Sequence, residues 1–163
     1  YAREVDFSHE PNLYGLFANK RAALQTLQSL ADELQLCYGL LGLEATTRGR
    51  ACFRSALKRC AGACCGKESV EEHHARFMAG LASISVNCWP WEGAVALKET
   101  RDGMTHYHII RNWLWLGAVE NLDDATALLR TPAGFDQDGY KILCKPLLTG
   151  KYEIIVLNDP AAR

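Results

Sequence analysis

The chain has 163 residues, of which 48% are hydrophobic and 23% are charged, and its formal net charge is −1. This composition is typical of a globular protein with one domain or two small ones. The longest apolar stretch, around residues 113–119, is far too short to span a bilayer. No basic segment followed by an apolar one opens the chain, so secretion is not indicated and we expect a cytoplasmic protein. Because the sequence starts at Tyr1 without a methionine, we also expect a further segment before it in the natural protein.

Two amphipathic helices are predicted in the first half of the chain. After a connector over residues 6–15, apolar residues recur at three- and four-residue steps from Asn19 to Gln35, which predicts a helix with Asn19 as its N-cap. An irregular stretch with short helical turns follows. A second helix is predicted from Ser69 to about Ser83, because Ser69 and Glu72 form a capping-box pattern.

Beyond residue 91 the pattern changes from helical spacing to alternation. Strands are predicted over residues 93–99, 105–117, 140–146 and 151–156, with hairpin turns at Asp102-Gly103 and Thr149-Gly150 and one helix over 122–130. We therefore expect an α+β fold. Residues 1–88 would form a helical, cysteine-rich subdomain, and residues 89–163 a small antiparallel sheet with one helix.

Seven cysteines, an odd number, favour thiolate ligands in a reducing compartment over disulfides. Four of them are separated by 14, 7 and 3 residues: Cys37, Cys52, Cys60 and Cys64. Four converging thiolates can hold a tetrahedral zinc ion or a [4Fe–4S] cluster. The absence of a Cys-x-x-Cys knuckle favours the cluster. Two alternatives remain open at this point, namely four buried free thiols and a ligand role for Cys65 in place of Cys64.

The stretch from Ala45 to Lys67 contains six basic residues and no acidic one: Arg48, Arg50, Arg54, Lys58, Arg59 and Lys67. Cations without intervening acids suit a DNA phosphate backbone, and this is the interpretation we favour for all six. The same charges could offset a cluster whose core and four thiolates carry a net charge of about −2. A merely solvated surface is the third interpretation.

Several other side chains are weaker candidates. His106 and His108 share one face of a predicted strand, but the sequence offers no third metal ligand at a spacing typical of metal sites. The segment from Asp136 to Gly139 resembles the start of a calcium loop, although a turn before a strand explains it better. Cys88 and Cys144 lie in apolar surroundings and are expected in the core.

The four tryptophans could stack on nucleic-acid bases. Trp113 and Trp115 alternate on a predicted strand, so a place in the core is expected for both. The Trp89-Pro90-Trp91 link is expected to be more open to solvent.

Several segments of the chain are similar to a known family. Residues 52–64, with the sequence CFRSALKRCAGAC, resemble the cysteine motif that follows the nuclease domain in UvrC-type GIY-YIG excision endonucleases. The run 13–17 and the leucine-rich helix before Cys37 resemble the lead-in to that motif. Residues 49–52, 88–91, 107–110 and 134–143 resemble the short, Cho-type members of the family. The resemblance covers all 163 residues and corresponds to the C-terminal half of such a protein.

The resemblance implies a role in nucleotide excision repair. Cho-type enzymes cut damaged duplex DNA on the 3′ side of a lesion after UvrA and UvrB have marked it, and an N-terminal GIY-YIG domain with a divalent metal does the cutting. The present sequence has no GIY…YIG pair, so no catalytic residue is expected in it. The family's cysteine motif is associated with an iron–sulfur cluster, and its four ligands correspond to Cys37, Cys52, Cys60 and Cys64.

We therefore expect a non-catalytic module that binds a [4Fe–4S] cluster and also binds DNA, the UvrB–DNA complex, or both. The alternative is a structural zinc or protein-interaction domain that does not touch DNA. An independent enzyme that uses Asp136, Asp138 or the histidine pair ranks last.

Overall fold

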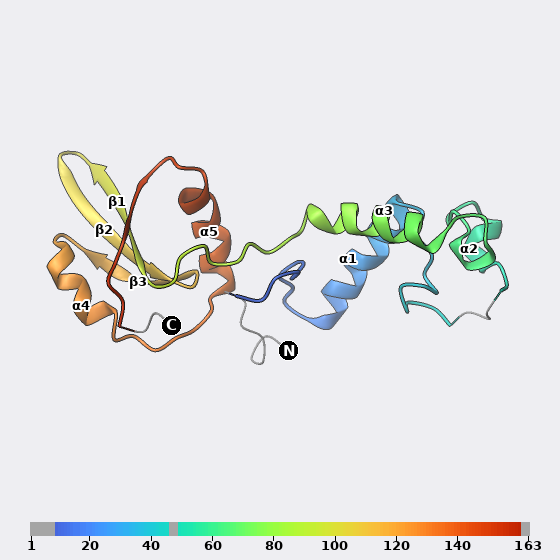
Figure 1. The fold of residues 1–163 in the computed structure, drawn as a ribbon, viewed down its shortest axis with the longest axis horizontal. Helices are drawn as coiled ribbons and strands as arrows, with labels where there is room; N and C mark the ends of the chain where they lie inside the picture. The colour runs from blue at the N-terminus through green and yellow to red at the C-terminus, as the bar shows by residue number, and fades with distance from the viewer. Residues whose placement is uncertain (1–8, 46–48, 161–163) are drawn as a thin grey trace. The chain divides into compact units, whose positions relative to one another are not determined.

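The computed structural model of the chain describes residues 9–45 and 49–160, and it divides into two compact units. The first, Tyr14–Val86, is called the cysteine unit here. The second, Asn87–Arg163 together with the residues up to Leu13, is called the sheet unit. Figure 1 shows the order of the elements along the chain. Within the described ranges, no helix combines the length and apolar character that a membrane span requires.

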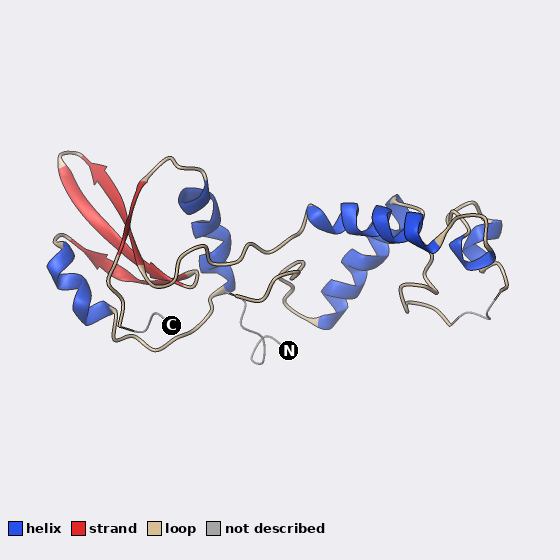
Figure 2. Cartoon of the chain, in the orientation of Figure 1, coloured by secondary structure: helices blue, strands red, loops and turns tan. Residues whose placement is uncertain are grey.

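Two long helices frame the cysteine unit (Figure 2): α1, Lys20–Glu33, and α3, Val70–Ala82. Both begin at the predicted caps. The Asn19 side chain accepts a hydrogen bond from the backbone of Ala22, and Ser69 forms a reciprocal capping box with Glu72. The predictions of both helices are confirmed.

The segment between these helices has little regular structure, as predicted. The described residues of this segment form α2, Phe53–Ala56, and one 3-10 turn, Ala63–Cys65. The two ends of the cysteine unit lie beside each other, because Tyr14 forms an antiparallel bridge with Ser85 and the Gly15 N–H donates to the carbonyl of Ile84 at 2.7 Å.

The sheet unit is built on a four-stranded antiparallel sheet in the order β3-β2-β1-β4. Its strands are β1 (Val95–Arg101), β2 (Met104–Arg111), β3 (Leu114–Val119) and β4 (Glu153–Val156). The β1–β2 turn falls at Asp102-Gly103, as predicted, and both residues have positive φ as a tight hairpin turn requires. A second turn at Asn112-Trp113 divides the predicted strand 105–117 into β2 and β3.

Each face of the sheet is covered by a different helix (Figure 1). One face packs against α4 (Ala125–Leu128), with Ala96 and Ile109 in its core. Side chains alternate across a strand, so the neighbouring Leu97 and Ile110 point to the opposite face, which faces α5 (Gln137–Leu148).

One predicted strand is wrong, because residues 140–146 lie inside α5. Asp136 caps this helix by accepting from the N–H groups of Asp138 and Gly139 at 3.2 and 3.0 Å, so the segment from Asp136 to Gly139 begins a helix and not a strand. The residues at Thr149-Gly150 end α5 instead of joining two strands. A short apolar run fits both periods, which explains the error. The sheet unit thus has α4 and α5 in place of one helix, and the predicted α+β class is confirmed.

The predicted burial of the tryptophans is partly wrong. Trp113 is fully buried and packs edge-on against Trp89 and Tyr140, with ring centroids 5.1 and 5.0 Å apart. Trp115, expected in the core, is 52% exposed, because Trp113 lies in the turn and the two side chains do not share a strand face. Trp89 is buried and donates from its indole to the carbonyl of Gly93, so the expected openness is wrong there. Cys88 is exposed, and the core position predicted for it is also wrong.

Candidate metal centre

Four cysteines from separate turns of the cysteine unit converge on one point. Cys37 follows α1, Cys52 caps α2, Cys60 lies in the loop after α2, and Cys64 lies in the 3-10 turn. Their Sγ atoms all lie within 4.8 Å of one another, and no other such group occurs in residues 9–45 and 49–160. The first three are buried and Cys64 is partly buried. This group can hold a metal ion.

The backbone around the four thiols bends sharply at residues with positive φ. Gln35 has a φ of 51° and Lys58 one of 57°, and the Gln35 side chain donates to the Lys58 carbonyl at 3.1 Å. The Ala61 N–H donates to the Gln35 carbonyl at 3.0 Å. Gly62 has a φ of 96°, and a Cβ there would lie 2.8 Å from the Cβ of Lys67, so glycine is required. These contacts hold the Cys60 loop against the end of α1.

Backbone N–H groups point at two of the sulfur atoms. The Cys52 N–H donates to the Sγ of Cys64, and the Gly62 N–H donates to the Sγ of Cys60, each at 3.4 Å. Hydrogen bonds of this kind stabilise a thiolate over a thiol and adjust the potential of iron–sulfur sites. The centre therefore offers donors that suit charged sulfur ligands.

Burial and hydrogen bonding shift the thiol pKa values in different directions. Burial raises the pKa of Cys37 and raises that of Cys60 to about 12. Burial also acts to raise the pKa of Cys52, but the backbone of Ser55 and the other three thiols outweigh it, and the net pKa is lowered. A metal ion that binds here has to displace protons, because thiolates are the ligands.

A histidine supports the first ligand from outside the sulfur cluster. The Cys37 N–H donates to Nε2 of His73, which is buried on α3, at 3.0 Å. Burial lowers the pKa of His73, and an accepting Nε2 requires the neutral ring. Neither periodicity nor spacing singles out the His73-His74 pair. The contact joins residues 36 positions apart, and the pattern of the sequence gives no sign of it.

Arg54 differs from the other cations that are expected to meet DNA, because its side chain is held by contacts within the cysteine unit. Its guanidinium lies 3.8 Å from the ring centroid of Tyr38 and donates to Asp32 and to the carbonyl of Arg59. The Arg54 side chain is only 12% exposed. Arg54 thus ties the last turn of α1 to the segments that follow Cys37 and precede Cys60. Four others are exposed: Arg50, Lys58, Arg59 and Lys67. Arg48 lies outside the described residues.

We expect Arg54→Ala to lower the free energy of unfolding of the cysteine unit by about 1–3 kcal/mol, because it removes charge-assisted hydrogen bonds and a cation–π contact. Arg54→Lys should not restore the lost stability, since an ammonium group cannot reproduce the planar set of N–H donors of the guanidinium. Urea titration of the metal-loaded chain by far-UV circular dichroism measures the effect. The exposed Arg50→Ala is the control and should stay within about 0.5 kcal/mol of the parent. Equal effects of the two alanine variants would contradict the bridging role of Arg54.

The structure brings Cys64, and not Cys65, to the other three cysteines. The Cys65 thiol donates instead to the carbonyl of Gly62 at 3.4 Å. The other weak candidates do not gather ligands. His108 pairs with Glu99 at 3.0 Å, and neither it nor Asp136 belongs to a group of three metal-ligating side chains within the described ranges.

Comparison with known proteins identifies the family of the chain. The family model described as UvrC/Cho excinuclease, middle domain, matches residues 1–83, and the model described as Excinuclease Cho C-terminal domain matches residues 94–161. The chain is 73% identical over 161 residues to the proteins named Excinuclease cho of Shigella flexneri and Escherichia coli (strain K12), an alignment that covers 99% of this chain and 54% of each relative. It is 71% identical over 157 residues to the protein of that name from Salmonella typhimurium, covering 96% of this chain and 54% of that relative.

The chain therefore spans about half the length of the curated relatives that it matches. No solved structure gives a significant match. The middle-domain match includes all four cysteines of the metal centre and covers more than half of the chain. The chain belongs to the UvrC/Cho excinuclease family.

Proposed function

We propose that the chain is the non-nuclease half of a Cho-type excision endonuclease of the bacterial cytoplasm. The complete protein would cut damaged duplex DNA on the 3′ side of a lesion marked by UvrA and UvrB. The name excinuclease, carried by the relatives, supports this activity for the whole protein. The observation that carries the role of this half is the convergence of the four thiols within 4.8 Å at the position of the family's cysteine motif. Residues 1–88 would hold the metal centre and meet the DNA or the UvrB–DNA complex, and residues 89–163 would form the second subdomain.

The cofactor proposed for this centre is a [4Fe–4S] cluster with Cys37, Cys52, Cys60 and Cys64 as ligands. Two N–H···S hydrogen bonds and the absence of a Cys-x-x-Cys knuckle support it. The exposed cations nearby in the sequence would offset the negative charge of the cluster. When bound, the cluster would cross-link the four turns that carry its ligands, in a part of the chain that has little regular structure of its own.

One observation favours zinc as a second candidate. Four thiolates around a single tetrahedral ion, each about 2.3 Å from it, are separated from one another by about 3.8 Å. The Sγ atoms lie within 4.8 Å of one another, so a modest contraction would suffice for zinc. A cube of four irons holds its thiolates farther apart, and the centre would have to widen to accept it.

Metal analysis of anaerobically purified chain distinguishes the two candidates. A [4Fe–4S] centre predicts about four irons and four sulfides per chain and a broad absorption in the visible range. One zinc per chain in a colourless protein would overturn the cluster and support the second candidate. A chain that retains neither metal after reconstitution with each would overturn both.

The proposed DNA contact rests on the four exposed cations: Arg50, Lys58, Arg59 and Lys67. We expect their joint replacement by glutamine to weaken duplex binding. The slope of log K against log salt should become shallower by up to about 0.9 for each phosphate that the variant no longer neutralises. Fluorescence anisotropy with a lesion-containing duplex at several salt concentrations measures both quantities.

The matched control replaces four exposed cations of the sheet unit with glutamine: Arg101, Arg130, Lys145 and Lys151. This variant has the same net charge as the first. If the two variants lose affinity equally, or if neither loses any, then the exposed cations of the cysteine unit do not form the DNA surface.

A further inference from the structure

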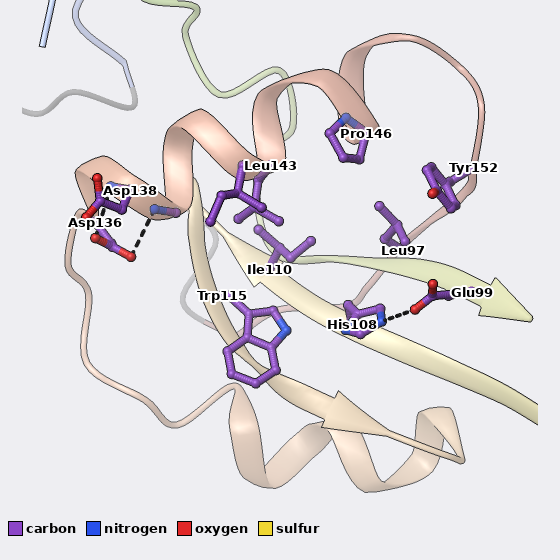
Figure 3. Close-up of a pocket in the computed structure, with 12 residues that line it drawn as sticks. Leu97, Glu99, His108, Ile110, Trp115, Asp136, Asp138, Leu143, Pro146 and Tyr152 are labelled. Carbon is purple, nitrogen blue, oxygen red and sulfur yellow. Dashed lines mark hydrogen bonds and ion pairs between the residues drawn. The ribbon is translucent and has the colours of Figure 1, made fainter. Parts of the chain in front are cut away.

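An open groove runs between α5 and the face of the sheet that α4 does not cover (Figure 3). Its volume is about 560 Å³, which falls in the range of ligand-binding clefts. Leu97 and Ile110 of the sheet form its floor, and Leu143 and Pro146 of α5 form its upper wall. All of the residues that line it belong to the sheet unit.

Two large apolar side chains of this groove are left uncovered. Trp115 on β3 is 52% exposed and Ile142 on α5 is 70% exposed. Both line the groove, Trp115 from the sheet and Ile142 from the helix. Exposed aromatic and aliphatic side chains beside a preformed hollow are the usual anchors of a binding surface.

The side chains that line the groove include three carboxylates and one histidine. Glu99 lies at one end, where it pairs with His108 at 3.0 Å, and Asp136 and Asp138 lie at the other (Figure 3). None of the described residues that line the groove is a lysine or an arginine. Lys141, outside the lining, lies 3.8 Å from the carboxylate of Asp138, whose side chain is 87% exposed. A phosphate backbone would be repelled here, whereas a cationic side chain would be attracted.

We infer that this groove docks a segment of a partner protein that carries a bulky apolar side chain flanked by lysine or arginine. The apolar side chain enters between Trp115 and Ile142, and the cation lies beside the carboxylate of Asp138. The apolar floor supplies the contact area, and the carboxylates at both ends select the charge of the partner. This site is separate from the metal centre, and the inference does not depend on the cofactor or on DNA binding.

Selection from a library of random displayed dodecapeptides, with the full 163-residue chain as bait, tests the inference. We expect the enriched peptides to combine aliphatic or aromatic residues with lysine or arginine. The binding of a synthetic enriched peptide is then measured by fluorescence anisotropy. Ile142→Lys should weaken it roughly tenfold or more, because the variant removes an anchor and adds a like charge. Leu148→Lys, at an exposed position of the same helix outside the groove, should leave it within about twofold.

A second pair of variants tests the charge. The double change Glu99→Gln and Asp138→Asn should weaken the binding of the peptide and make its affinity less dependent on salt concentration. The control, Glu120→Gln with Asp123→Asn, changes two exposed carboxylates outside the groove and should alter neither quantity. The inference fails if no peptide is enriched, or if binding survives Ile142→Lys. It also fails if a single-stranded oligonucleotide displaces the peptide, which would assign the groove to nucleic acid. It fails, too, if the peptide binds this chain but does not bind a full-length relative. In that case the groove is occupied by another part of the same protein.

Discussion

Replacement of Cys60 by serine is expected to abolish metal binding and to unfold the segment between α1 and α3. Cys60 is only 7% exposed, and its Sγ lies within 4.8 Å of three other ligand sulfurs. A serine hydroxyl does not replace a thiolate, and structural zinc sites, for comparison, contribute on the order of 10–16 kcal/mol of apparent binding free energy. Metal stoichiometry and the far-UV circular dichroism melting curve, measured on the same preparations, give the result.

Two neighbouring cysteines supply the control for this experiment. Cys65→Ser should keep the metal, because the Cys65 thiol donates to the carbonyl of Gly62 and stands outside the sulfur group, whereas Cys64→Ser should lose it. If Cys65→Ser loses the metal and Cys64→Ser keeps it, then Cys65 is the ligand and Cys64 is not. All four tryptophans lie in residues 87–163, so their fluorescence reports whether the sheet unit stays folded while the metal is lost.

Asp159→Ala is expected to destabilise the sheet unit by about 3–5 kcal/mol, the usual cost of leaving a buried charge without its partner. The Asp159 side chain is 0% exposed and accepts from Arg111 at 3.2 Å and from the Ala94 N–H at 3.0 Å. Arg111 also donates to the carbonyls of Leu129 and Thr131. The pair therefore joins the end of the chain to β1, β2 and the loop after α4. Urea titration followed by tryptophan fluorescence measures the loss.

Glu153→Ala is the matched control, because it breaks an ion pair that is open to solvent. Glu153 accepts from Lys98 at 2.8 Å, and its side chain is 60% exposed. Exposed pairs contribute about 0–1 kcal/mol, so this change should shift the urea midpoint only slightly. If Asp159→Ala shifts it by the same small amount, the buried pair does not hold the unit together.

The elements that the sequence predicts well are those with local signals. Asn19 and the Ser69–Glu72 pair mark the starts of α1 and α3, and Asp102-Gly103 marks the turn between β1 and β2. Helix α5 carries an equally local signal, the Asp136 cap. The apolar residues after this cap also alternate, so the pattern fits a turn followed by a strand as well as a capped helix, and the strand prediction is wrong.

The site divides in the same way between local and distant contacts. The spacing of the four cysteines and the family resemblance are enough to name the group that the fold brings together. The sequence pattern does not distinguish Arg54 from exposed cations such as Lys58. The partners of Arg54, Asp32 and Tyr38, lie far from it in sequence. The hydrogen bond from Cys37 to His73 depends on how α3 packs beside the end of α1. Periodicity and charge counts carry no information on such contacts.

The bridge between Tyr14 and Ser85 has a consequence for how the protein tolerates damage to its metal centre. A chain that enters and leaves a unit at adjacent points can open that unit locally while the rest keeps its structure, as in other separately cooperative parts of proteins. Loss of the metal would then be a reversible local melting within residues 14–86, between α1 and α3. Reloading of the centre could restore those residues without refolding the sheet unit.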